Sequence, residues 1–279
     1  MEHIITLARS PDLDMPMQGR CIYCRKEPPD VQLTREHIIP DGIGGNLVLP
    51  DGSCRECANI FKEFEGPVMT TSFGMARDSM RLRSKKRRGR ARRHRTTYAT
   101  LDHEGRRGTE EYYPINPFMP SLVVTAGHNV RARILTGETG PVAPIAVSMC
   151  TLRSDNIPHS RTIAALIDPA GMARFVAKIA HCYAVAAFGI DGFLPYLVDF
   201  IKGPGSKYTY TNPHLIGSVP RQVDPSALHK ISVRVVEQIG SQLPMMPAHK
   251  KQLVVVTLSL FCPYDVPDYE IVAGEIPSA

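Results

Sequence analysis

The sequence predicts an α+β protein in three parts, which are set by two changes of composition along its 279 residues. Residues 18–70 are dense in Cys, Gly, Pro and charge, with too few apolar side chains for an ordinary core, so we expect a bound metal to fold them. Residues 75–110 are polar and basic and predict an arm or linker, at most partly helical. Residues 112–279 have an ordinary globular composition, which predicts an α+β domain of unassigned role.

Four segments of the third part predict β-strands because they are rich in Val, Ile, Leu and Thr. They are residues 121–135, 142–152, 231–239 and 253–261. A helix is expected between the second and the third of these segments. Asp168 is placed to cap it, Pro169 suits its first position and Gly189 marks its end. Asp191 predicts the start of a second helix, which ends near residue 203.

The long helix has one apolar face, which is expected to pack on the sheet. Its residues are Met172, Phe175, Val176, Ile179 and Tyr183. Arg174, Lys178 and His181 recur on the helix at positions i, i+4 and i+7. We expect them to form a solvated outer stripe, with contact to DNA phosphates as the alternative.

The basic character of the chain comes from one segment. The net charge is +6, but residues 77–95 alone carry eleven Lys or Arg and one acid, so the rest of the chain is net negative. Such a cluster attracts polyanions and releases their counterions, which favours nucleic acid as the partner over a small ligand. A solvated tail is the alternative. The expected phosphate contacts are Arg81, Arg83, Lys85, Lys86, Arg87, Arg88, Arg90, Arg92, Arg93 and Arg95.

The N-terminus has no basic segment followed by an apolar run, and the most apolar stretch, residues 172–201, is interrupted by charges. These features predict an intracellular, cytoplasmic protein without a signal peptide or a membrane span.

Four of the seven cysteines fall in two Cys-x-x-Cys pairs, Cys21/Cys24 and Cys54/Cys57. Two such pairs can present four thiolates tetrahedrally to zinc, and a site with four protein ligands is structural rather than catalytic. Ser53 and Glu56 have capping-box spacing, which predicts that a helix begins beside the second pair. A redox-active dithiol or two unrelated pairs are the alternatives.

Between the pairs lie Glu36 and His37, followed by Pro40 and two glycines, Gly44 and Gly45. A carboxylate suits a hard cation such as Mg²⁺ or Mn²⁺, and a neutral imidazole suits general-base work on water. A surface acid and a histidine that merely supports the fold are the alternative.

The order Cys-x-x-Cys, Glu-His-Ile-Ile-Pro, Gly-Gly and Cys-x-x-Cys resembles the zinc-stapled HNH (ββα-metal) endonuclease family over residues 18–65. The resemblance implies a β-hairpin and a helix that hold one Mg²⁺ or Mn²⁺ ion against a DNA phosphodiester. It implies that His37 is the general base and that Glu36 ligates the catalytic ion. Nicking or double-strand cleavage of double-stranded DNA is the implied activity.

The remaining motif positions are less regular. Many family members have a histidine directly after the last cysteine, where this chain has Ala58 followed by Asn59. Asn59 is a candidate ligand of the catalytic ion, or else a surface amide on the helix. Asn46 matches the middle Asn of the motif and is expected to orient its loop or His37. Glu63 and Glu65 follow on the helix, where solvated charges are expected and a metal ligand is the alternative.

Two other functions fit the same residues. The first is a zinc-dependent, non-catalytic nucleic-acid-binding protein with a regulatory role, which Ala58 favours. The second places the activity, such as small-molecule binding, in residues 112–279. That part is also expected to select the target, a protein partner or a second copy of the chain.

Overall fold

The structure is a computed structural model. It describes residues 1–6, 10–74, 77, 80–82, 96–101, 104, 107–112, 121–123, 132–136, 147–149, 162–164, 169–203, 215–219, 221–239, 250–264 and 266–277. Among these residues, no helix is both long enough and apolar enough to cross a membrane.

An antiparallel sheet forms one layer of the molecule, in the strand order β1-β12-β13-β14. Two short strands, β10 and β11, pair one after the other along the outer edge of β14. The bounds are β1 Glu2–Ile5, β10 Leu194–Pro195, β11 Ile216–Val219, β12 His229–Ile239, β13 Lys250–Leu260 and β14 Asp268–Ile276. The predicted strands over 231–239 and 253–261 are therefore confirmed, as β12 and β13. Strands β1 and β14 were not predicted.

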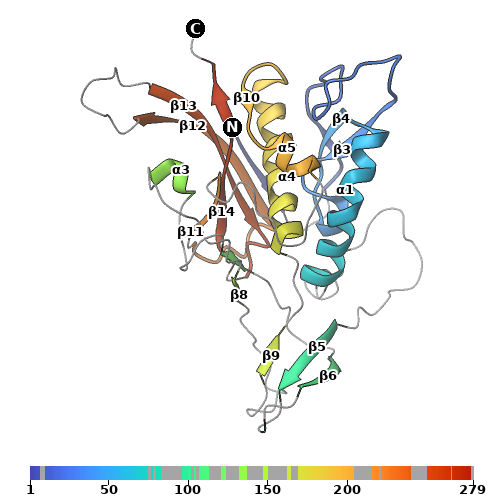
Figure 1. The fold of residues 1–279 in the computed structure, drawn as a ribbon, viewed down its shortest axis with the longest axis vertical. Coiled ribbons are helices and arrows are strands. Elements are labelled where there is room, and N and C mark those ends of the chain that lie inside the picture. The colour runs from blue at the N-terminus through green and yellow to red at the C-terminus, as the bar shows by residue number, and fades with distance from the viewer. Residues whose placement is uncertain are drawn as a thin grey trace.

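Helix α4 (Pro169–Phe188) forms the second layer and confirms the predicted long helix. It lies between the sheet on one side and β3, β4 and α1 on the other (Figure 1). Every residue from 171 to 186 is buried, so the predicted solvated stripe is wrong: the exposed fractions of Arg174, Lys178 and His181 are 5%, 2% and 0%. The physical reason is that the N-terminal module, residues 18–72, packs on this polar face.

The N-terminal module has a ββα arrangement, formed by β3 (Leu33–His37), β4 (Leu47–Cys54) and α1 (Arg55–Pro67). A short strand β2 (Leu13–Asp14) runs parallel to β4 on the side away from β3. A 3-10 turn η1 (Asp41–Ile43) follows β3, and a π-helical turn η2 (Val68–Ser72) extends α1. The glycine pair closes η1: Gly44 has φ +94°, and a Cβ on Gly45 would lie 1.9 Å from the carbonyl oxygen of Ile39.

The second helix begins later than predicted. Helix α5 spans Val198–Lys202, whereas Asp191 is not a cap: its carboxylate pairs with Arg20 and Arg25 of the N-terminal module. The distance from Asp191 Oδ1 to Arg25 Nη1 is 2.8 Å.

Three small groups of elements complete the described fold. Strands β5 (Thr96–Leu101), β6 (Arg107–Tyr112) and β9 (Thr162–Ala164) pair in the order β6-β5-β9, so part of the predicted basic arm is a strand. Strands β7 (Ser121–Val123) and β8 (Val147–Met149) pair within the predicted strand regions. The region 121–135, which was expected to contain strand runs, also includes the start of the short helix α3 (Arg133–Thr136). The predicted boundaries of the three parts stay a prediction.

A buried histidine joins the sheet to the N-terminal module. His229, at the start of β12, donates from Nε2 to the carbonyl oxygen of Ile43 at 2.8 Å, and its Nδ1 accepts from the amide of Phe261 at 3.0 Å. Both ring nitrogens are thus used by the neutral imidazole. Burial lowers the pKa of His229 to about 4.

We expect this histidine to make folding sensitive to acid. Its folded pKa lies below the ordinary value of 6.5, so the unfolded chain binds more protons between about pH 6.5 and pH 4. The contribution of His229 to the free energy of unfolding is fully present above pH 6.5 and is lost as the pH falls toward 4. Urea unfolding at pH 7 and pH 4.5 tests this. Between these pH values, the free energy of unfolding of His229→Gln, which keeps a donor and an acceptor, should fall by about 2–3 kcal/mol less than that of wild type. Equal losses in the two proteins would contradict it.

Candidate metal centre and active site

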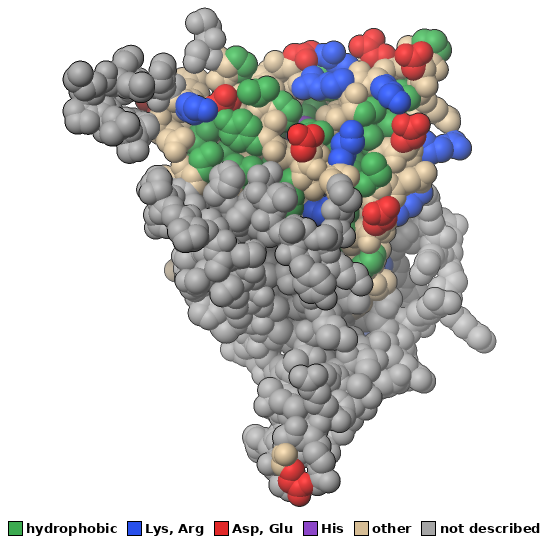
Figure 2. All heavy atoms as spheres, viewed as in Figure 1, with side chains coloured by type: hydrophobic (Ala, Val, Ile, Leu, Met, Phe, Trp, Pro, Cys, Tyr) green, Lys and Arg blue, Asp and Glu red, His purple; other side chains and the backbone are tan. Residues whose placement is uncertain are grey.

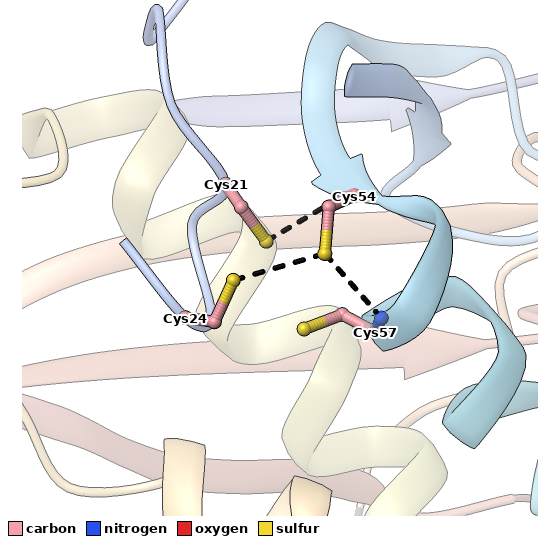
Figure 3. A group of neighbouring side chains, drawn as sticks. All are labelled: Cys21, Cys24, Cys54 and Cys57. Carbon is pink, nitrogen blue, oxygen red and sulfur yellow. Dashed lines mark hydrogen bonds between the residues drawn. The ribbon is translucent and has the colours of Figure 1, made fainter. Parts of the chain in front are cut away.

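The four paired cysteines converge on one point. All four Sγ atoms lie within 4.8 Å of one another, and the side chains of Cys21, Cys24, Cys54 and Cys57 point toward a common space (Figure 3). Among the described residues, this is the one group of three or more Cys, His, Asp or Glu side chains close enough to hold a metal ion. The predicted pairing of the two Cys-x-x-Cys motifs is therefore confirmed.

Local backbone structure brings the thiols together. Cys21 and Cys24 occupy a tight turn, in which the amide of Arg25 donates to the carbonyl oxygen of Cys21 at 2.9 Å. Cys54 caps α1 and Cys57 lies in its first turn. The Cys54 thiol, rather than the predicted Ser53, accepts the capping bond from the amide of Cys57 at 3.5 Å. Ser53 is buried and its side chain faces Thr34 on β3 instead.

The geometry and the donors fit zinc. A tetrahedron with Zn–S bonds of ~2.3 Å has S–S edges of about 3.8 Å, and the sulfurs of Cys24 and Cys54 are 3.7 Å apart. Backbone amides at Cys54 and Cys57 donate to thiol sulfurs, which is how proteins orient and stabilise thiolate ligands. A hydrogen bond with Cys57 lowers the pKa of Cys21 to about 4, while the same bond raises the pKa of Cys57 and burial raises the pKa of Cys24. Before any cation binds, Cys21 therefore ionises more readily than Cys24 and Cys57.

Comparison with protein families places this segment. Residues 21–72 match the family model described as HNH endonuclease. This segment is an HNH endonuclease-family module. The match covers under a fifth of the chain, and it indicates a nucleic-acid-related function for that part. No curated protein and no solved structure was found to match the chain.

His37 lies at the end of β3, on the outer face of the HNH hairpin, with 27% of its side chain exposed. Its Nε2 atom is 4.0 Å from Oδ1 of Asp12, which belongs to the segment preceding β2. Arg35, two residues earlier on β3, reaches the same segment: its Nη2 is 3.5 Å from Asp12 and 2.8 Å from Asp14. Asp12 was missed in the sequence because it lies outside the motif, 25 residues before His37.

Asn46 forms two hydrogen bonds with the segment that carries Asp12. Its carbonyl oxygen accepts from the amide of Leu13 at 2.8 Å, and its side-chain amide donates to the carbonyl oxygen of Pro11 at 3.2 Å. Asn46 thus holds the segment that carries Asp12 next to His37. The role expected for Asn46, to orient its own loop or His37, stays a prediction.

Glu36 points to the opposite face, away from His37, because neighbouring residues of a strand alternate in direction. Its side chain is 9% exposed and its carboxylate contacts Nζ of Lys178, which projects from α4. Glu65 of α1 contacts the same ammonium group, with Oε1 2.5 Å from Nζ. Burial raises the pKa of Glu65, while the two carboxylates keep the pKa of Lys178 above its ordinary value despite its burial.

Asn59 is exposed on α1, where its Oδ1 accepts from Lys62 at 2.7 Å. The two predicted ligands of the catalytic ion, Glu36 and Asn59, are therefore not brought together. Lys178 already neutralises the Glu36 carboxylate, so the residues do not fit a Mg²⁺ or Mn²⁺ ion held by this pair.

The basic segment falls mostly outside the described residues. This applies to Arg83, Lys85, Lys86, Arg87, Arg88, Arg90, Arg92, Arg93 and Arg95. Arg81 is described and exposed, and Arg77 ties the start of the segment to the HNH module by donating to the carbonyl oxygens of Gly42 and Met69. Acidic and basic side chains are interspersed over the coloured part of the face drawn in Figure 2.

We expect the HNH module to depend on zinc. Cys54→Ser should reduce bound zinc from about one per chain to near zero and lower the unfolding midpoint by more than roughly 10 °C. Metal analysis and thermal unfolding measure the two effects. Cys262→Ser is the matched control, because Cys262 is equally buried but lies outside the cluster. Full zinc content in Cys54→Ser would contradict a four-cysteine site.

Proposed function

We propose that the chain is an endonuclease that hydrolyses phosphodiester bonds in DNA, with His37 as the general base. The observation that carries the proposal is the HNH module with a partly exposed histidine at the position of the family's base. The zinc would hold the module together without touching the substrate, because four protein thiolates leave it no open position.

Asp12 extends the role of His37. A carboxylate near an imidazole stabilises the imidazolium that forms when the base accepts a proton from water. In this chain the two side chains share the outer face of the hairpin, and Asn46 fixes the segment of Asp12. We therefore assign Asp12 to hold His37 in position for attack by water on the phosphorus atom.

The cation that the family uses stays a prediction for this chain. The carboxylate of Glu36 forms an ion pair with Lys178, and Asn59 is exposed to solvent. The same two observations favour a second candidate function, a zinc-dependent protein that binds nucleic acid without cleaving it. A role of the remaining residues in selecting a target, a protein partner or a second copy also stays a prediction.

Cleavage of supercoiled plasmid tests the first candidate. Wild-type protein is expected to nick or linearise DNA with Mg²⁺ or Mn²⁺ and to stop with EDTA. His37→Ala should lose at least ~100-fold in rate, because general-base catalysis contributes that much. Asp12→Asn should lose less, about 10-fold or more, since it acts through His37.

Asp14→Asn is the matched control, because Asp14 lies in the same segment as Asp12 and its carboxylate pairs with Arg35 at 2.8 Å. It should leave the rate within about 2-fold. Cleavage that survives His37→Ala would remove His37 from the mechanism. If the zinc-loaded wild type and its variants all bind DNA in a salt-sensitive way without cleaving it, that result would establish the second candidate function instead.

The basic segment supplies a separate expectation for binding. Replacing Arg90, Arg92, Arg93 and Arg95 by Gln should weaken binding on all DNA sequences alike and reduce the slope of log K against log salt by up to about 0.9 per lost phosphate contact. Fluorescence anisotropy at several salt concentrations measures this. An unchanged slope would show that the segment does not touch phosphates.

A further inference from the structure

Lys178 is the feature of the fold that the proposed function leaves unexplained. It lies in the middle of α4, its side chain is 2% exposed, and its ammonium group contacts two carboxylates that both belong to the HNH module. Glu36 comes from the hairpin and Glu65 from the helix α1. A side chain from outside the module therefore enters the junction of its hairpin and its helix.

Besides these two acids, an aromatic ring and a thiol lie near the ammonium group. Nζ of Lys178 lies 5.7 Å from the ring centroid of Phe61, which is buried. One turn further along α4, Cys182 contacts the buried hydroxyl of Tyr23, at 3.0 Å between Sγ and the oxygen. A charge enclosed in this way must be compensated by its immediate neighbours, because water cannot do so.

The charges themselves indicate what this position requires. Two carboxylates need positive charge between them, and the ammonium group is the cation that the described structure supplies. Carboxylates are also the ligands of hard divalent ions, which approach oxygen to about 2.0–2.6 Å. An ammonium nitrogen in contact with both acids takes the space such an ion would need.

We propose that Lys178 is the resident cation of the Glu36–Glu65 pair and excludes divalent metal from it. Glu36 is then a docking residue that fastens the HNH module to α4, and a metal ion binds to the pair only when Lys178 is withdrawn. The proposal concerns the acid pair and not His37, so it does not depend on whether the chain cleaves DNA.

Manganese binding to the zinc-loaded full chain tests the proposal. Electron paramagnetic resonance titration of free Mn²⁺ should show the same binding for wild type and Glu36→Gln, because Glu36 is not a ligand while Lys178 is in place. A loss of bound Mn²⁺ in Glu36→Gln alone would overturn the proposal. This comparison needs no lysine variant.

Removing the lysine should create a site. Lys178→Met leaves two carboxylates facing each other in an apolar surrounding, so it should bind one additional Mn²⁺ per chain, and Mn²⁺ should raise its unfolding midpoint by several degrees. Both effects should disappear in Lys178→Met/Glu36→Gln. Lys62→Met, which removes an exposed lysine of α1, is the matched control and should behave as wild type. Absence of any Mn²⁺ effect on folded Lys178→Met would also overturn the proposal.

If Lys178→Met does not fold without metal, refolding the same variant with Mn²⁺ decides whether the proposal holds. Recovery by Mn²⁺ supports the proposal, whereas recovery only in the triple neutral variant Glu36→Gln/Glu65→Gln/Lys178→Met contradicts it. In that case the lysine would be a structural partner of the two acids and not a substitute for a metal ion.

Discussion

The burial of helix α4 on both of its sides is the constraint on which the rest of the structure depends. Its apolar face packs on the sheet, and its polar face is covered by the HNH module. Burying Arg174, Lys178 and His181 is tolerable only where each finds a partner. Arg174 donates to the carbonyl oxygen of Ile201, Lys178 meets two carboxylates, and His181 bonds the carbonyl oxygen of Ile22.

This arrangement joins the two ends of the chain into one packed unit. Strand β1, which precedes the HNH module, pairs with β12 of the sheet, while His229 on β12 bonds to the loop that follows the Glu-His motif. One continuous cluster of buried apolar residues runs from Cys21 in the module to Ala273 in β14. Metal binding at the four-cysteine cluster would therefore stabilise more than its own turn, since Ile22 and Tyr23 in that turn contact α4.

Sequence reasoning reached the parts of the site that depend on spacing along the chain. The two Cys-x-x-Cys pairs, the ββα order and the helix α4 are local patterns, and each is present as predicted, whereas the predicted cap Asp168 lies outside the described residues. It failed where distant segments meet. An Arg and a Lys four residues apart on an isolated helix predict a solvated face. Nothing in the residues around Lys178 indicates that two acids more than 110 positions earlier in the chain will face it. Asp12 was missed for the same reason.

The alternation of side chains along β3 separates the two adjacent residues of the motif. A register irregularity between Thr34 and Glu36 sets the phase of the strand, so that Glu36 enters the junction with α4 and His37 faces outward beside Asp12. The two residues then belong to different chemical environments: Glu36 is a buried, compensated charge, and His37 is a partly exposed imidazole whose Nε2 atom is buried. Since packing against α4 holds Glu36 where it is, the proposed base His37 would act only with ligands that come from its own side of the hairpin. Under the proposed function, the site that faces substrate is built from β3 and the segment before β2, whereas the acid that the motif pairs with the histidine fastens the HNH module to α4.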